Sequence, residues 1–214
     1  MINILGIGWI EKKEYGIVKK NKNYQYKNID FLYNELKNKK ILSNSIKNFN
    51  RFPINTKLVC CNIALALYDA GMINRKNLDV GIIGTNIKGA LKENINYFED
   101  YVNSGRVLSR GNLFIYTLPS SSLAEASIHF SLQGSLVYVN YAKDNLLEII
   151  KNIKHNFLLY GYKTMIIIDF SKNKSICLVV SYKNKAKKTI CFLETFEKII
   201  EKHIEYKKIV SELI

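Results

Sequence analysis

Four cysteines and three histidines are the side chains best suited to covalent or metal chemistry in this 214-residue chain. Cys60 and Cys61 are adjacent in an apolar, alanine-rich segment, which favours core thiols over nucleophiles. Adjacent cysteines cannot easily bridge, and together with Cys177 and Cys191 they give no CxxC spacing for zinc. We therefore expect reduced structural thiols and no metal.

The other candidate chemistry also has a structural interpretation. His129 stands two residues before Ser131 in a segment of small residues, and we expect a structural histidine rather than a base. Gly6 and Gly8 could begin a dinucleotide-binding loop, but no third glycine follows at the required spacing. The sequence therefore predicts no cofactor.

The amino-terminal part of the chain predicts strands and helices in alternation. Short apolar runs indicate buried strands, and Gly71 stands where a helix C-cap glycine is favoured. Residues 11–50 are rich in Lys and Asn and give one amphipathic helix. The expected elements are strands at 2–10 and 79–85, and helices at about 29–36, 56–70 and 88–102.

The carboxyl-terminal part continues the alternation. Ser120, Ser121 or Ser122 can cap a helix that Gly134 would end. The expected elements are helices at 123–132, 144–157 and 194–214, and strands at 137–141, 165–170, 176–182 and 189–192. This order predicts one α/β domain over residues 1–214, with a mostly parallel central sheet of about five strands, flanking helices and a late antiparallel hairpin.

Four segments carry a resemblance to a known family. They are the opening strand ILGIGWI at 4–10, the helix ending in YDAG at 68–71 with the strand VGIIGT at 80–85, the segment YTLPS at 116–120 with the helix after it, and the strand at 137–141 that runs into a helix. This ordered set resembles the N-terminal half of the β-ketoacyl synthase family, in the thiolase-like superfamily. The resemblance implies half of a thiolase-like fold.

The position of the family's nucleophilic cysteine departs from the pattern. An ungapped alignment places it on Lys143, and a one-residue deletion places it on Ala142; neither is a thiol. In the family that cysteine lies at the N-terminus of a buried helix, where the dipole lowers its pKa. Lys143 as an amine nucleophile would need a depressed pKa and a neighbouring base that the sequence does not offer. The family's histidine pair is not matched by His129, His155 or His203.

The resemblance therefore implies a non-catalytic partner subunit. The nearest type is the chain-length factor, a ketosynthase homologue without the cysteine that pairs with an active ketosynthase in fatty acid, polyketide or aryl-polyene type chain elongation. Tyr97, Phe98 and Tyr101 would approach the acyl tunnel, although core packing explains these aromatics equally well. The expected interface, with a ketosynthase or a second copy, is the strand Val137, Tyr138, Val139, Asn140 and Tyr141.

The charge of the chain leaves several partners open. A net charge of +14 favours acidic partners such as an acyl carrier protein, but Lys is abundant throughout, so composition explains the charge too. The sequence disfavours nucleic-acid binding as an alternative, since the lysines are scattered and no recognition motif occurs. A second alternative is a β-ketoacyl-ACP synthase-type acyltransferase that is active only with another subunit.

The expected location is the cytoplasm. The apolar runs are too short to cross a bilayer, and the N-terminus meets Glu11 directly after its apolar stretch, without the basic start of a signal peptide. We therefore expect no membrane span.

Overall fold

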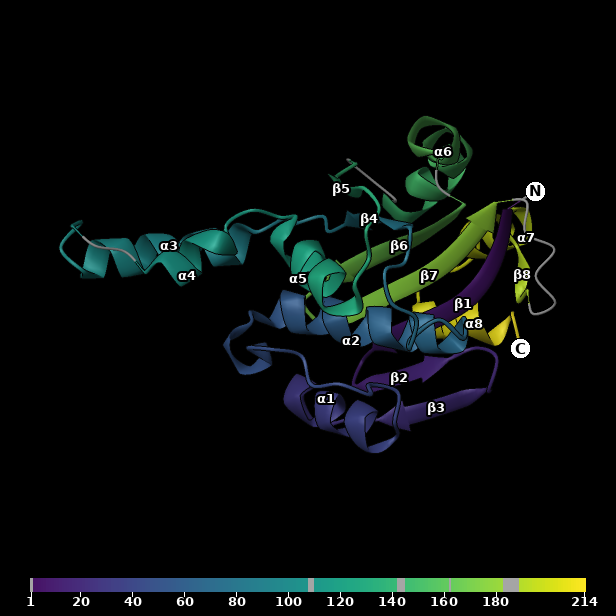
Figure 1. Cartoon of the computed structure of the whole chain (residues 1–214), viewed down its shortest axis with the longest axis horizontal. Coiled ribbons are helices and arrows are strands. Elements are labelled where there is room, and N and C mark those ends of the chain that lie inside the picture. The colour runs from purple at the N-terminus through teal and green to yellow at the C-terminus, as the bar shows by residue number, and fades with distance from the viewer. Residues whose placement is uncertain (1, 108–109, 142–144, 162, 183–188) are drawn as a thin grey trace.

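A mixed sheet lies between two layers of helices in the computed structural model, which describes residues 2–107, 110–141, 145–161, 163–182 and 189–214 (Figure 1). Its strands run in the order β3-β2-β1-β7-β6-β4-β5, and β8 also pairs with β1. The strands are β1 (Ile2–Glu11), β2 (Glu14–Ile17), β3 (Lys22–Gln25), β4 (Val80–Thr85), β5 (Leu136–Val139), β6 (Thr164–Ser171), β7 (Lys174–Tyr182) and β8 (Cys191–Phe192).

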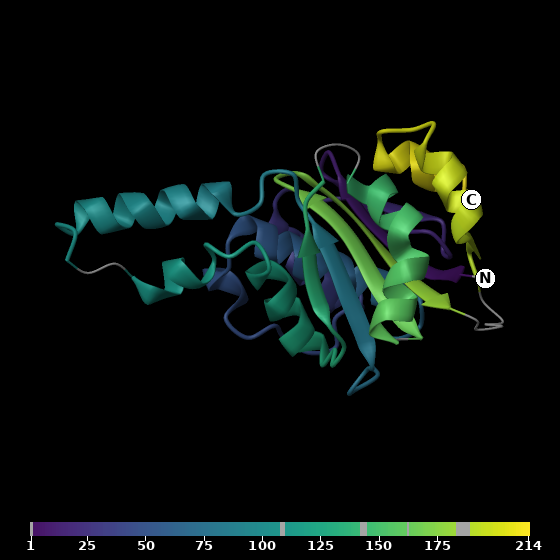
Figure 2. The ribbon, with the colours of Figure 1, turned by 90° about the horizontal axis from the view of Figure 1, so that it is seen from above.

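Helices cover both faces of the sheet. One face carries α1, α2 and α5, and the other carries α6, α7 and α8, while α3 and α4 project away from the sheet (Figure 2). No helix among the described residues is long and apolar enough to span a membrane. The helices are α1 (Ile29–Asn38), the 3-10 helix η1 (Phe49–Arg51), α2 (Ile54–Asp69), α3 (Leu91–Asn103), α4 (Gly111–Ile115), α5 (Ser121–Phe130), α6 (Asn145–Tyr160), α7 (Leu193–Ile200) and α8 (Tyr206–Ser211).

Strand β1 forms the centre of the core. Its pairing with β7 shifts register between Ile4 and Gly6, which places Ile4 and Ile7 on the same face of the sheet. The Ile7 N–H is satisfied by the Asp69 carboxylate at 2.9 Å, and the Lys19 N–H donates to the same group at 3.1 Å. The end of α2 is thereby fixed to β1.

Helix α2 is buried almost completely, because the sheet lies on one side of it and α1 and α5 on the other. Close packing against β1 requires glycine: a Cβ at Gly6 would lie 2.4 Å from the Ala70 nitrogen and 2.5 Å from the Ala66 oxygen. Gly71 follows the helix with a φ of +70°, as the sequence predicted for a cap.

The sheet is not mostly parallel, which corrects the sequence prediction. Among the described pairings, only β4 with β5 and β4 with β6 are parallel; β1–β2, β1–β7, β1–β8, β2–β3 and β6–β7 are antiparallel. Short turns join β1 to β2, β2 to β3 and β6 to β7, and a short turn permits only antiparallel pairing. The sheet has eight described strands rather than about five.

Strands β2 and β3 were missed because each has only four residues and the surrounding stretch is rich in Lys and Asn. They form a hairpin extension beside β1, in which the Tyr15 and Tyr24 rings stack with centroids 5.3 Å apart. The ammonium of Lys39, the residue that follows α1, lies 3.3 Å from the centroid of the Tyr24 ring, and the Tyr15 hydroxyl donates to Glu35 of α1 at 3.2 Å. The end of α1 therefore holds the extension in place.

Two predicted helix boundaries were also wrong. Helix α5 ends at Phe130 with Ser131 in the left-handed conformation, whereas Gly134 packs against β4, where a Cβ would lie 2.5 Å from the Gly81 nitrogen. The helix begins without a serine side-chain cap. The single helix expected at 194–214 is divided into α7 and α8, because Tyr206 turns back to donate a hydrogen bond to Asp169.

Candidate interface at the edge of the sheet

Strand β5 lies at one edge of the sheet and is only half-buried. It pairs with β4 in parallel, and among the described residues no strand lies on its other side. Val137 packs toward α6 and its cluster, whereas Tyr138 packs toward the α2 face. The predicted strand 137–141 is shifted, since β5 ends at Val139 and Asn140 and Tyr141 follow it. Such an edge can accept a further strand.

The backbone geometry identifies which groups are free on this edge. The Ile82 N–H donates to the Ser135 carbonyl oxygen at 2.8 Å, so Ser135 faces β4. Alternate residues of a strand direct their backbone groups to opposite edges. Val139 therefore directs its N–H toward β4, whereas Tyr138 and Asn140 direct theirs to the open side.

The expected position of the lost nucleophile falls between β5 and α6. Ala142 and Lys143 lie outside the described residues, so their geometry stays a prediction. Beside the end of β5, Thr85 of β4 pairs with Val139 of β5 on one side and with Asp169 of β6 on the other. Burial raises the pKa of the Asp169 carboxyl, which accepts a hydrogen bond from the Tyr206 hydroxyl at 2.5 Å. Asp169 thereby anchors α8.

The cysteines provide no accessible thiolate. Cys60, Cys61 and Cys177 are buried, and burial raises the pKa of each thiol well above its ordinary value. Cys191 is half-buried, and burial raises the pKa of its thiol to about 11. The sequence interpretation of free, structural thiols is confirmed.

The three histidines are also dispersed. Burial lowers the pKa of His129, whose ring packs edge-on against Phe130 at 4.7 Å between centroids. His155 is exposed on α6, and His203 pairs with Glu212 near the C-terminus. Among the described residues, no group of three His, Cys, Asp or Glu side chains could hold a metal.

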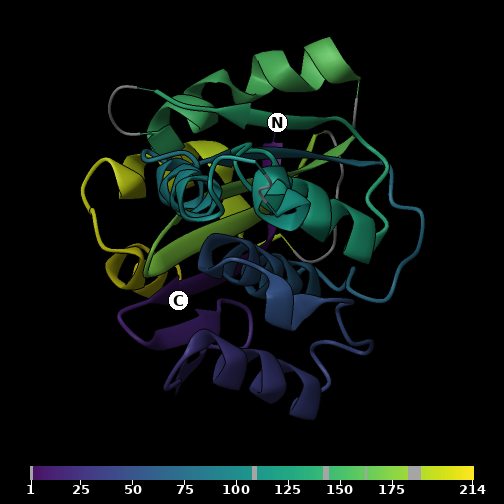
Figure 3. The same ribbon diagram turned by 90° about the vertical axis from the view of Figure 1, so that its left-hand side faces the viewer.

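Helix α3 carries an apolar stripe that no part of the described chain buries. Leu91, Ile95, Phe98 and Val102 recur at helical spacing, and they are 57%, 48%, 63% and 37% exposed. The Arg110 guanidinium binds Asp100 at 2.7 Å and ties the segment before α4 to α3. Figure 3 shows the arm formed by α3 and α4 pointing at the viewer, with α6 and α1 at opposite sides of the molecule. We call Leu91, Ile95, Phe98 and Val102 the arm stripe.

The predicted tunnel residues divide between two sides of the arm. Tyr97 packs against Phe114 of α4, with ring centroids 5.6 Å apart, and Tyr101 is likewise half-buried. Phe98 instead belongs to the arm stripe. The sequence pattern predicted the helix but not its exposure, because an amphipathic face looks the same whether its own sheet or another chain covers it.

Comparison with known proteins identifies the fold. No family model matches the sequence, and no curated protein matches it. Solved structures do match. The ishigamide ketosynthase/chain length factor has a TM-score of 0.61 at 11% identity, over 87% of this chain and 63% of that chain. The Xenorhabdus doucetiae ketosynthase ApeO in complex with its chain length factor ApeC gives 0.51 at 11% identity, over 68% and 64%.

A third structure contains a carrier protein. The type II polyketide complex AntDE:AntF, an acyl-carrier protein with its ketosynthase, gives a TM-score of 0.53 at 11% identity, over 99% of this chain and 81% of that chain. This chain spans less than two thirds of the length of the first two structures. The half thiolase-like fold expected from the sequence is thus confirmed, as a mixed sheet flanked by helices.

Proposed function

We propose that this chain, as one domain, is a non-catalytic ketosynthase-like partner subunit, of the chain-length-factor type, in acyl-chain elongation. The observation that carries the proposal is the conjunction of two uncovered surfaces: the open edge of β5 and the arm stripe of α3. A half-buried edge strand invites pairing, and an exposed apolar stripe of this kind is typical of a docking site. The partner is a ketosynthase or a second copy of this chain.

The thiol chemistry supports a non-catalytic role. A ketosynthase-type nucleophile must be a reachable thiolate, and each described cysteine has its thiol pKa raised by burial. Lys143 or Ala142 occupies the position that the resemblance assigns to that nucleophile. The partner would therefore supply the chemistry.

An acyl tunnel would form only with a second chain. Tyr97 supports the arm from the α4 side, Tyr101 is half-buried, and Phe98 would enter the partner's surface. An acidic acyl carrier protein is the further partner that the charge of +14 favours. Two of the solved structures are ketosynthases with chain length factors, and a third contains an acyl-carrier protein.

Light scattering after size-exclusion chromatography tests the interface, with the chain alone and mixed with a candidate ketosynthase. Phe98→Glu should convert the assembly to a monomer, because it buries a charge in the interface. The matched control is Ile128→Glu on α5, at a side chain that is 77% exposed and outside the arm. A wild-type monomer under both conditions would contradict the proposal.

A condensation assay with acyl and malonyl carrier-protein substrates tests the missing chemistry. The chain alone should give no product, and adding an active ketosynthase should give product whose length depends on Phe98. Turnover by the chain alone would refute the non-catalytic role. Turnover that needs this chain plus a partner without its own cysteine would favour the acyltransferase alternative.

A further inference from the structure

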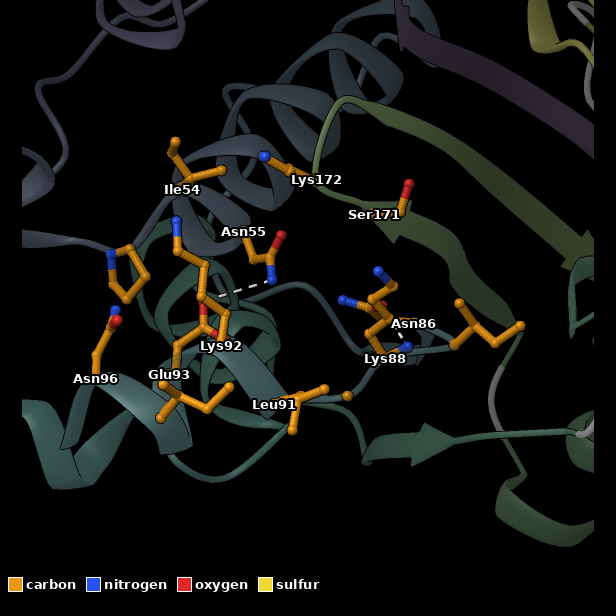
Figure 4. A pocket seen from close by; sticks show the side chains of 14 residues that line it. Ile54, Asn55, Asn86, Lys88, Leu91, Lys92, Glu93, Asn96, Ser171 and Lys172 are labelled. Atoms are coloured by element: carbon orange, nitrogen blue, oxygen red, sulfur yellow. Dashed lines mark hydrogen bonds between the residues drawn. The ribbon is translucent and has the colours of Figure 1, made fainter. Parts of the chain in front are cut away.

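The cavities of the described chain differ in their charge and in their place in the fold. One of about 500 Å³ lies between the start of α2 and the start of α3, where Asn55 faces the Glu93 carboxylate (Figure 4). Leu91 and Ile95 of the arm stripe line it, so this cavity belongs to the surface already proposed for the partner. A second cavity, of about 230 Å³, lies between the loops that follow α1 and α2 and the end of α5.

This second cavity lies at the amino end of β4. Just before that strand begins, the Leu78 N–H donates to the Ser131 carbonyl oxygen at 3.0 Å, and Leu78 pairs with Leu132. The position assigned to the lost nucleophile instead follows the carboxyl end of β5, which runs parallel to β4. A ligand in the second cavity would therefore lie at the opposite end of these strands from the acyl chemistry of the proposed function.

Hydrogen-bond donors dominate the lining of the second cavity. Arg75 and Lys76 come from the loop after α2, and neither has an ion pair within the described part of the chain. His129 lines the cavity from α5. The Ser43 hydroxyl donates to the Asn74 Oδ1 atom at 3.1 Å, so the Asn74 amide group remains as a donor. No Asp or Glu lines this cavity among the described residues.

Carbonyl oxygens at the helix ends beside the cavity are engaged by main-chain donors. At the end of α5, the Ser127 oxygen accepts from the Leu132 N–H at 3.0 Å. After α2, the Met72 oxygen accepts from the Arg75 N–H at 3.1 Å. These bonds satisfy acceptors that would otherwise repel an anion at the negative end of each helix. The lining therefore favours a ligand that is negatively charged and rich in acceptor oxygens.

We propose that this cavity binds a phosphate group, either free or at the end of a compact phosphate monoester. The Arg75 guanidinium can hold two phosphate oxygens, and Lys76 would balance the second negative charge. His129 and Asn74 would donate to the remaining oxygen. Donors that come from several segments suit a tetrahedral anion better than a planar carboxylate.

The size of the cavity limits the rest of the ligand. Its volume of about 230 Å³ is below the roughly 300–1,000 Å³ that is usual for the sites of drug-sized ligands. Leu42 and Phe130 also line it, and they would cover a short carbon skeleton. The inference does not rest on the proposed partner role.

Isothermal titration calorimetry at about 0.15 M salt tests the proposal, because general attraction to a chain of charge +14 is then largely screened. The ligands are glycerol 3-phosphate and inorganic phosphate, and the controls are glycerol and acetate. We expect at least one phosphate to bind about tenfold or more tightly than either control. The stronger of the two phosphates identifies the source of the group. Acetate or glycerol binding as tightly as both phosphates would overturn the proposal.

Two variants at exposed positions locate the binding. Arg75→Gln and Lys76→Gln should each weaken phosphate binding about tenfold or more, and the exposure of both side chains should leave the fold intact. The matched control is Arg106→Gln, which removes the same charge from an exposed arginine outside this cavity. Unchanged affinity in both cavity variants, or equal weakening in Arg106→Gln, would overturn the proposal. Phe98→Glu should bind phosphate normally, which separates this test from that of the partner role.

Discussion

Strands β1 and β5 are both apolar, yet they have opposite surroundings. Strand β1 pairs with β2, β7 and β8, and nearly all of its residues are buried. Strand β5 pairs on one side only, and all four of its residues are half-buried. Two helices show the same contrast. Helix α2, like β1, is buried on all sides, whereas α3, like β5, has no fully buried residue.

This contrast separates stability from function. Strand β1 is paired along both sides, and its glycines admit the backbone of α2. Strand β5 and helix α3 each pack within the chain on one side, and their other side has no complement among the described residues. Mutations near β1 should therefore change the free energy of unfolding, and mutations on the uncovered sides of β5 and α3 should change association.

The largest effect is expected at Gly6. Gly6→Val should destabilise the fold by about 3 kcal/mol or more, because a Cβ would overlap backbone atoms of Ala66 and Ala70 that cannot move independently. Urea denaturation followed by circular dichroism measures this. The control is Gly111→Ala, where an added Cβ meets nothing within 4 Å and should leave stability unchanged. A Gly6→Val variant as stable as the wild type would contradict the claim that the packing of α2 on β1 requires glycine at this position.

Single proline substitutions at two adjacent positions should distinguish the side of β5 that pairs with β4 from its open side. Val139→Pro removes an N–H directed at β4 and should cost about 1–3 kcal/mol of stability. Asn140→Pro removes an N–H on the open side, so it should leave the unfolding free energy nearly unchanged while weakening association. Urea denaturation and light scattering on both variants decide this. If Asn140→Pro associated like the wild type, the open edge would not be the interface.

A smaller, pH-dependent effect is expected at Asp169. Burial raises its pKa above the ordinary 3.8, so the folded state holds this proton to a higher pH than the unfolded state. The stability that this proton contributes is present at low pH and is lost as pH rises through the folded pKa. Asp169→Asn removes this loss, so the variant should gain stability relative to wild type as pH rises above about 4. Denaturation curves at several pH values measure the difference, and a constant difference would contradict the assignment.

The smallest effect on stability is expected in the arm stripe. Phe98→Ser should change the unfolding free energy of the isolated chain by less than about 0.5 kcal/mol, because the side chain is 63% exposed. Thermal unfolding of the monomer measures it. A marked destabilisation of the monomer would mean that the stripe packs within its own chain, and the contrast between α2 and α3 would disappear.

Much of the fold was predictable from the sequence because its signals are local. The buried strand at 2–10, the apolar helix before Gly71 and the strand at 79–85 were confirmed within one or two residues. Their apolar periodicity is independent of which elements they meet. The short hairpin of β2 and β3 has no such signal, because it is held by ring stacking and by Lys39, the residue that follows α1.

The sequence by itself determined the α/β class, the free thiols, and the absence of cysteine at both positions where the resemblance places the nucleophile. Only the tertiary structure decided that the sheet is largely antiparallel, that Gly134 packs on β4, and that α7 and α8 are separate. Only the tertiary structure shows that β5 lies at an edge of the sheet and that the arm stripe is exposed. The physical reason is that periodicity specifies which face of an element is apolar, whereas strand order and the cover of each face depend on contacts between residues far apart in the chain.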